Sequence, residues 1–159
     1  MEHTIDKAQN KVRHVEHNPK IWVVSVGEGR KEILTEINEC DSWTVASKGS
    51  IRDLVLFYHN APESSIKDIF LIKGDVYKDL AGDWTKKKWD FFASIKRIAH
   101  INTPISFQEM KNDENLSKSH MVLMQMNGRF EATDYWDRLF EMIIGKNPEL
   151  KKELKPFSP

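Results

Sequence analysis

Short runs of apolar residues, separated by turn-forming residues, dominate the middle of the chain and predict β-strands. The runs occupy residues 21–26, 43–47, 53–58, 66–73, 89–101 and 121–126, and the fifth is long enough to bend. Apolar residues recur at three- and four-residue spacing over residues 33–40 and 133–145, which predicts two helices, the second ending at Gly145. Pro104 and Ser106 are helix start signals, so a short helix is expected over residues 103–111.

This order of elements predicts an α+β fold. About six strands and three or four helices without βαβ regularity indicate a mixed β-barrel with peripheral helices, and a long bent strand is typical of barrel closure. We expect a flexible lead over residues 1–19, one domain over residues 20–145, and a charged tail or linker over residues 146–159.

Composition narrows the class of protein. The chain has 159 residues, of which 40% are apolar and 30% charged, so one domain with its own core is expected. It has one cysteine and no apolar secretory signal near its start, which predicts a cytoplasmic protein. Lys plus Arg equals Asp plus Glu, at 24 each, so contact with nucleic acid would have to come from a local patch.

The common catalytic templates are missing from the sequence. It contains no P-loop, no G-x-G-x-x-G, no G-x-S-x-G and no H-E-x-x-H. His14 and His17 lie three residues apart in a polar lead, where solvation is the simpler interpretation. We therefore expect no metal, no cofactor and no catalysis.

Two tryptophans are the strongest functional signal. Trp43 and Trp84 each stand at the polar edge of an apolar run, near hydroxyl side chains and lysines. Flat rings beside cations suit a nucleobase attached to phosphates, although both rings are equally compatible with a core position. Trp22 and Tyr58 either fill the barrel or form the floor of a pocket. The remaining candidate base-binding residues are Ser25, Val26, Thr44 and Ser47.

Cationic side chains follow both tryptophans. Lys48 and Arg52 come soon after Trp43. Further along the chain, beyond Trp84, the sequence places Lys86, Lys87, Lys88 and Arg97. Charge runs usually mark a solvated face, but beside a stacking ring they are expected to hold phosphates.

Several of these segments resemble the PUA-like superfamily, in particular its EVE and YTH domains. Trp22-Val-Val-Ser is similar to their first strand, and Asp53-Leu-Val-Leu-Phe-Tyr is similar to an EVE strand, although Arg52 stands where EVE domains have glycine. The segments 104–109 and 128–144 resemble later EVE elements. Trp43-Thr44 and the Trp-x-x-x-Lys-Trp pattern from Trp84 to Trp89 resemble the YTH segments that supply two walls of an aromatic cage.

The resemblance implies a PUA-like barrel that binds a modified base without catalysis. A methylated base of DNA or RNA would be flipped into a cage walled by Trp43 and Trp84. Such a domain often acts as the specificity module of a modification-dependent restriction system, with a fused or associated nuclease or NTPase, and we expect a monomer when it is isolated. Two alternatives stay open: an ASCH-like nucleoside hydrolase, whose signature is half matched by Gly29-Arg30-Lys31, and a methyl-lysine-binding module, which Asp83 beside Trp84 favours.

Overall fold

The computed structural model describes residues 19–27, 36–37, 40–78 and 91–159. The described strands form one seven-stranded sheet in the order β2-β6-β4-β3-β1-β7, with β5 paired to β6. Its strands are β1 (Ile21–Val26), β2 (Cys40–Thr44), β3 (Leu54–His59), β4 (Ser65–Ile72), β5 (Tyr77–Lys78), β6 (Phe91–Ser106) and β7 (Arg129–Glu131). The sheet is mixed, because β1 and β3 are parallel and the other pairs are antiparallel.

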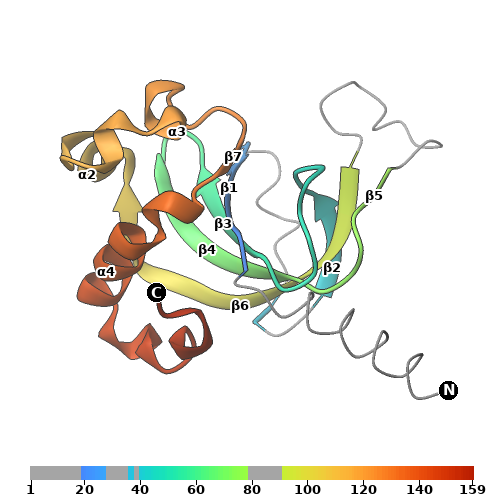
Figure 1. The fold of residues 1–159 in the computed structure, drawn as a ribbon. Coiled ribbons are helices and arrows are strands. Elements are labelled where there is room, and N and C mark those ends of the chain that lie inside the picture. The colour runs from blue at the N-terminus through green and yellow to red at the C-terminus, as the bar shows by residue number, and fades with distance from the viewer. Residues whose placement is uncertain (1–18, 28–35, 38–39, 79–90) are drawn as a thin grey trace, which may run out of the picture.

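The sheet curls along its length into a half-barrel (Figure 1). β6 spans 16 residues and forms hydrogen-bonded pairs with β2, β4 and β5, so it is the strand that connects these three within the sheet. Its pairing with β4 shifts register twice, between Ile66 and Asp68 and between Ile69 and Phe70. Such irregularities bend a strand and increase its twist. The predicted α+β barrel with peripheral helices and a long bent strand is therefore confirmed.

Alternation along the strands sends side chains into two separate cores. We call one side of the sheet the inner face; its core contains Trp22, Val24, Phe57, Phe70 and Ile95, among others. The other side is the helix-covered face. There Val23, Leu56, Ile69 and Ile101 meet the helices.

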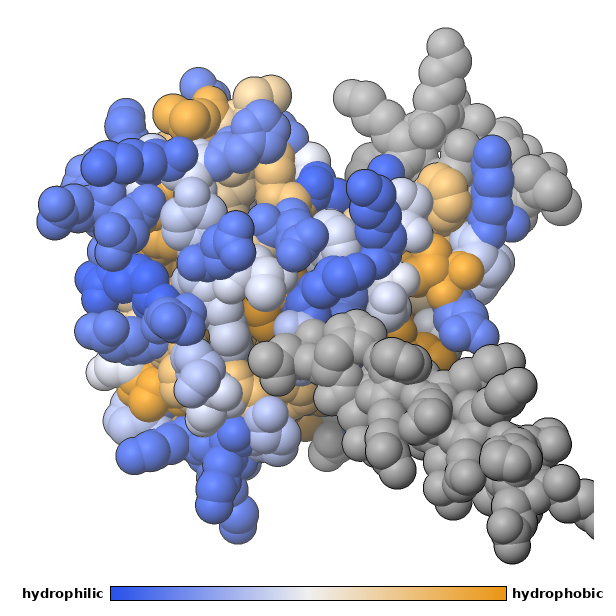
Figure 2. Space-filling view, in the orientation of Figure 1, coloured by the Kyte–Doolittle hydropathy of each residue, from blue (hydrophilic) through white to orange (hydrophobic). Residues whose placement is uncertain are grey.

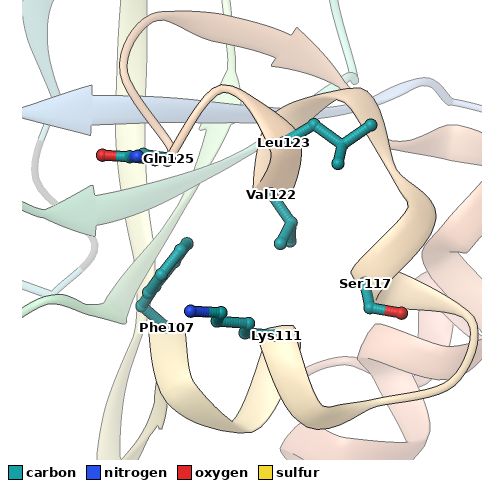
Figure 3. A pocket seen from close by; sticks show the side chains of 6 residues that line it. All are labelled: Phe107, Lys111, Ser117, Val122, Leu123 and Gln125. Carbon is teal, nitrogen blue, oxygen red and sulfur yellow. The ribbon is translucent and has the colours of Figure 1, made fainter.

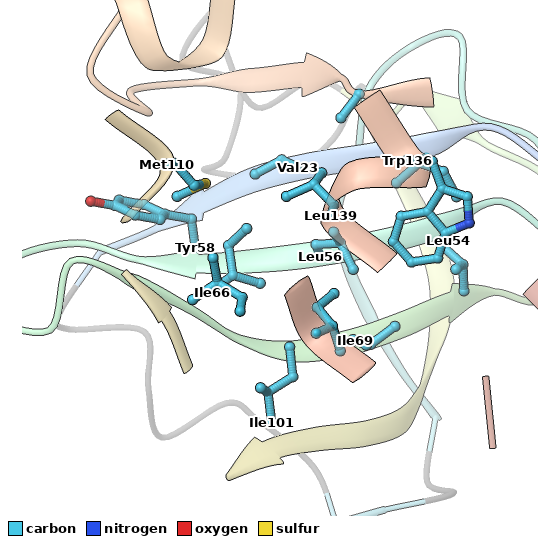
Figure 4. Packing of buried hydrophobic residues seen from close by; sticks show 14 of the residues in the cluster. Val23, Leu54, Leu56, Tyr58, Ile66, Ile69, Ile101, Met110, Trp136 and Leu139 are labelled. Carbon is cyan, nitrogen blue, oxygen red and sulfur yellow. The ribbon is translucent and has the colours of Figure 1, made fainter. Parts of the chain in front are cut away.

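Helices and short 3-10 turns close the helix-covered face. They are α2 (Phe107–Asn112), η2 (Leu116–Lys118), α3 (His120–Leu123), η3 (Thr133–Tyr135), α4 (Trp136–Lys146), η4 (Pro148–Lys151) and η5 (Lys155–Phe157). Figure 4 shows Trp136 and Leu139 of α4 lying over strand residues such as Leu54 and Leu56. Among the described residues, no helix is long and apolar enough to cross a membrane.

The prediction of a strand over residues 121–126 is wrong. This run begins with α3, which the Ser119 side chain caps by accepting a hydrogen bond from the Val122 amide. The chain then reverses through Gln125 and Met126, both at positive φ, and the Met126 amide returns to the Met121 carbonyl. A short apolar run does not distinguish a buried helical turn from a strand.

Other boundaries differ from the predicted ones for local reasons. β6 continues through Thr103 to Ser106, so the expected helix begins only at Phe107, where the Ser106 hydroxyl accepts a hydrogen bond from the Glu109 amide. The expected helix over residues 33–40 lies mostly outside the described residues, and Cys40 already belongs to β2. The strand expected over residues 43–47 ends at Thr44. The Asn127–Gly128 turn leads into the short strand β7, and Gly128 has φ 134°.

Helix α4 ends at Lys146 instead of at the predicted Gly145, and the residue after it, Asn147, makes polar contacts with the end of the helix and with β6. Asn147 is fully buried, and its side chain accepts a hydrogen bond from the Thr103 amide and donates to the Thr103 and Ile143 carbonyls. Beyond it, Leu150 and Leu154 join the core of the helix-covered face. The segment expected to be a charged tail therefore packs against the domain.

Candidate nucleic-acid interface

A row of three aromatic rings crosses the inner face. Trp43 of β2 is partly buried, and its ring centroid lies 5.8 Å from that of Phe57 at an interplanar angle of 40°. Phe57 in turn stacks on Phe70 of β4 at 4.4 Å. We call Trp43, Phe57 and Phe70 the aromatic row. Its two phenylalanines are fully buried, whereas Trp43 is partly buried and packs against the same core.

The curl of the sheet is what brings Trp43 into this row. β2 and β3 are separated in the sheet by β6 and β4, yet the rings of Trp43 and Phe57 touch. The β6 residue opposite Trp43 is Ala93, whose small side chain leaves the indole free to lean inward. The tilted contact with Phe57 packs one side of the indole against the inner core.

A charged cluster adjoins the aromatic row on the same face. Its centre is Asp68, which is opposite Phe57 in the β3–β4 ladder and is 1% exposed. Asp68 Oδ2 lies 2.8 Å from His59 Nε2, and Oδ1 lies 2.9 Å from His100 Nδ1 and 3.0 Å from Arg97 Nε. A second guanidinium nitrogen of Arg97 also pairs with Oδ1. We call His59, Asp68, Arg97 and His100 the Asp68 cluster.

The hydrogen bonds of the cluster keep Asp68 ionised. Burial alone would raise the pKa of this carboxyl, but hydrogen bonds from His59, His100 and Arg97 outweigh it and lower the pKa to about 2. The two register shifts between β4 and β6 flank Asp68 and turn it toward His100. Bulges often aim a side chain in this way near functional sites.

The two histidines of the cluster have different surroundings. His59 is buried, and its Nδ1 has no hydrogen-bond partner within the described part of the chain, although Glu63 Oε2 lies 3.5 Å away. The His100 side chain is 40% exposed. The imidazole of His100 therefore connects the buried hydrogen bonds of the Asp68 cluster to the protein surface.

Trp22 and Val26, two predicted base-binding residues, belong to the inner core. The Trp22 indole donates a hydrogen bond of 2.9 Å from Nε1 to Asp53 Oδ2 and is 6% exposed. Val26 is 2% exposed. Trp22 thus fills the barrel, and Asp53, which also accepts from the Lys20 and Ser50 amides, holds it there.

Ser25 and Tyr58 lie on the opposite side of the sheet from Trp43. They are neighbours in the parallel β1–β3 register, and Tyr58 packs in the core of the helix-covered face. Burial raises the pKa of Tyr58, and a hydrogen bond with Ser64 opposes this effect. The Ser25 hydroxyl accepts a hydrogen bond from the Gly128 amide. The strand period of two separates both residues from the aromatic row.

The segment after Trp43 carries the other described candidates. Thr44 is buried, and its hydroxyl has no hydrogen-bond partner among the described residues; it points away from Trp43 because it follows it in the strand. Ser47, Lys48 and Arg52 are exposed. Arg52 has φ 79°, a conformation that favours glycine.

The remaining predicted phosphate contacts fall into two groups. Trp84 and Lys86 to Lys88 lie outside the described residues. Arg97 is described, but its guanidinium is directed at Asp68 and its side chain is 16% exposed. Its positive charge is thus compensated within the protein.

Sequence reasoning missed three members of the cluster: His59, Asp68 and His100. A signal was present, because Asp68 interrupts an apolar strand between Ile66 and Ile69. A carboxylate in such a run is either a mistake in the strand assignment or a buried, paired charge. Among the described residues, no group of three or more His, Cys, Asp or Glu side chains is arranged to hold a metal ion.

The fold is identified by comparison with solved structures, because comparisons of the sequence found no match. No protein-family model matches the sequence, and no curated protein matches it. Among solved structures, a hypothetical protein from Leishmania major superposes with a TM-score of 0.63 at 16% identity, covering 82% of this chain and 98% of that one.

Two human structures superpose in the same way. The DUF55 domain of human thymocyte nuclear protein 1 gives a TM-score of 0.57 at 14% identity, covering 77% of this chain and 98% of that domain. Human THYN1, in complex with DNA containing 5-methylcytosine, gives 0.61 at 11% identity over 78% and 97%. With its curled mixed sheet and peripheral helices, the protein described here has the PUA-like α+β fold.

Proposed function

We propose that this protein recognises a modified base in nucleic acid without catalysing a reaction on it. The observation that carries the proposal is Trp43, a large ring that is only partly buried, on the inner face of a PUA-like barrel. A protein of the same fold, human THYN1, has been solved with DNA that contains 5-methylcytosine. A single-stranded or flipped base stacks on Trp43, and the ligand is DNA or RNA that carries N6-methyladenine, 5-methylcytosine or a related base.

Stacking supplies affinity but little selectivity. One base on one ring contributes roughly 1–3 kcal/mol, which offsets the few kcal/mol needed to flip a paired base. A buried methyl group adds about 0.8 kcal/mol, or about fourfold. Larger selectivity requires a polar group that the wrong base leaves unpaired.

Cations that follow Trp43 in the sequence are proposed to hold the flanking phosphates. Lys48 and Arg52 are exposed on the segment that follows Trp43, and no ion-pair partner is found for either among the described residues. The Lys20 ammonium donates to the Lys48 carbonyl, so a third cation lies against this segment. Lys86 to Lys88, which follow Trp84 in the sequence, are proposed to contact phosphates as well.

The proposal is tested with a panel of oligonucleotides of one sequence, as DNA and RNA, single-stranded and duplex, unmodified or carrying one methylated base. Fluorescence anisotropy measures their affinities for the wild type, Trp43→Ala and Trp43→Leu. Leucine keeps an apolar group against Phe57 but removes the flat ring, so it protects the fold. We expect both variants to lose about 5- to 150-fold for the preferred oligonucleotide and to lose the preference itself.

The matched controls separate stacking from charge. Lys48→Ala and Arg52→Ala should weaken all oligonucleotides alike and reduce the salt dependence of binding, whereas Lys151→Ala, an exposed cation of η4, should change nothing. Equal binding of every oligonucleotide by wild type and Trp43→Leu would refute the proposal. A methyl-lysine peptide and free modified nucleosides in the same assay test the two alternatives, and turnover of a nucleoside would make the protein an enzyme.

We further propose that the domain supplies specificity to a modification-dependent restriction system, together with a nuclease or NTPase. A bound modified base identifies the DNA, and the partner cuts it. The family resemblance supports this role. Plating efficiency of phage with methylated and unmethylated genomes, on cells that express the protein with its neighbouring genes, measures it.

A further inference from the structure

A second candidate site lies among the short helices at the other end of the molecule. α2, η2 and α3 surround a pocket of about 260 Å³, lined by Phe107, Lys111, Ser117, Val122, Leu123 and Gln125 (Figure 3). These helices cover the helix-covered face of the sheet, whereas Trp43 lies on the inner face. The pocket is therefore separate from the candidate base-binding site, and it plays no part in the function proposed above.

The pocket combines apolar walls with one ammonium group. Figure 3 shows Val122 pointing into the pocket from α3, opposite Phe107, and the Lys111 side chain extending across the opening toward Phe107. Leu123, which lines the pocket, is 68% exposed, and the next residue, Met124, is 50% exposed. Figure 2 shows hydrophobic groups reaching the surface over the α3 region. Exposed apolar residues that adjoin a pocket are typical of an interaction site.

Lys111 is the charged residue among those that line the pocket, and Glu114 and Lys118 are exposed on the neighbouring segment. Two carboxylates of this segment are already paired, Glu109 with Lys146 and Asp113 with Arg138. Lys111 and Lys118 have no ion-pair partner among the described residues and are exposed. An acidic ligand complements this arrangement, because it would neutralise cations that the fold leaves unpaired.

The size of the pocket indicates what enters it. Sites for drug-sized ligands and cofactors measure roughly 300–1,000 Å³, so about 260 Å³ accommodates a single large side chain better than a whole cofactor. Met124, beside the pocket, is a flexible residue that adapts to different partners. The backbone also holds Gln125 at φ 55° and Met126 at φ 61°, an uncommon conformation for such residues.

We propose that this pocket binds a short acidic segment of a partner protein. One large apolar side chain of the segment enters between Phe107 and Val122, and a neighbouring carboxylate pairs with Lys111. This mode follows the usual anatomy of a peptide contact, in which one buried apolar anchor is flanked by polar interactions. The partner is thereby held on one side of the domain while the inner face stays accessible.

A peptide-display selection on the immobilised full chain tests the proposal. Random twelve-residue peptides are selected against the wild type, and the enriched sequences are synthesised for anisotropy measurements. We expect a consensus of one large apolar residue within two positions of Asp or Glu. Leu123→Asp should weaken these peptides about tenfold, and Lys111→Glu about fivefold. Leu123 and Lys111 are both exposed, so neither substitution should disturb folding.

Two controls make the result specific. Lys151→Glu has the same charge change at an exposed site of η4 and should leave binding unchanged. Peptides whose acidic residues are replaced by lysine should bind Lys111→Glu better than the wild type. A selection without an apolar-acidic consensus, or equal effects of Lys111→Glu and Lys151→Glu, would overturn the proposal. Competition between a selected peptide and an oligonucleotide for Lys111 would assign the pocket to nucleic acid instead.

Discussion

Asp68 is the residue whose environment most constrains this protein. It is a carboxylate at 1% exposure within the inner face, and His59, His100 and Arg97 surround it. A buried charge is tolerated only when it is paired and hydrogen-bonded. The cluster therefore couples strands β3, β4 and β6 through one side chain, next to the aromatic row.

Replacement of Asp68 by asparagine should cost about 3–5 kcal/mol in the free energy of unfolding, because the guanidinium of Arg97 then loses its buried counter-charge. Urea denaturation of the wild type and Asp68→Asn measures this cost. Glu114→Gln, a change at an exposed carboxylate, is the matched control and should cost less than about 0.5 kcal/mol. A cost for Asp68→Asn as small as that of the control would mean that the cluster does not stabilise the fold.

The same residue predicts how stability depends on acidity. The pKa of Asp68 falls from an ordinary 3.8 to about 2 in the folded protein, so the unfolded chain binds the proton more readily. Its stabilising contribution, about 2 kcal/mol, is therefore complete above about pH 4 and disappears as the pH falls toward 2. The difference in unfolding free energy between wild type and Asp68→Asn should shrink over this window. A difference that stays constant down to pH 2 would contradict the lowered pKa.

At the scale of elements, one buried serine decides the structure of residues 120–123. Ser119 is 1% exposed; its hydroxyl donates to the Leu116 carbonyl and accepts from the Val122 amide, which joins η2 to α3. The apolar residues that follow have no helical pattern long enough to nucleate a helix by themselves. The cap therefore determines that the run turns, instead of extending as a strand.

Ser119→Ala should lower the free energy of unfolding by about 1 kcal/mol, because the first turn of α3 loses its side-chain acceptor. Thermal and urea denaturation measure the change. Ser117→Ala is a suitable comparison, since the Ser117 hydroxyl makes only an exposed hydrogen bond to the Glu114 carbonyl. Equal stabilities of the two variants would show that the buried cap does not hold α3.

At the scale of the whole molecule, one arginine joins the two edges of the curled sheet. β2 and β7 stand at opposite ends of the strand order, yet Arg129 of β7 donates a hydrogen bond of 2.7 Å to the carbonyl of Val45, which directly follows β2. Val45 is two residues from Trp43 and belongs to the same inner core. The contact thus closes the half-barrel beside the ring proposed to stack on a base.

Arg129→Met should loosen this closure, since methionine keeps much of the stem but has no donor. Amide hydrogen exchange in β2 should become faster, and the free energy of unfolding should fall by about 1–2 kcal/mol. Oligonucleotide binding should weaken as Trp43 becomes less well positioned. Lys73→Met, a change at an exposed cation, is the control for loss of charge. Unchanged exchange in β2 would indicate that the sheet holds its curl without Arg129.

Local patterning was sufficient to predict the fold class and most of its elements. Strands β1, β3 and β4 lie within one residue of the predicted segments, and helix α4 begins three residues after the predicted start, because each has an apolar run of clear period and defined turn signals. The period also explains why Ser25 and Tyr58 could have been separated from Trp43 once strand pairing was known. The run 121–126 was misassigned because a short apolar run does not distinguish a helical turn from a strand. Its packing depends on residues that are far from it in the sequence.

Sequence by itself determined the alternation that creates two apolar faces, the long bent strand and the position of Trp43 at the polar edge of an apolar run. Only the tertiary structure decided which of these residues meet. The curl places Trp43 against Phe57 across two intervening strands, and register shifts bring His100 beside Asp68 although 32 positions separate them. These contacts depend on strand order, curvature and bulges. Pairing between strands that are distant in the sequence sets these features, and the local periodicity of the sequence does not encode them.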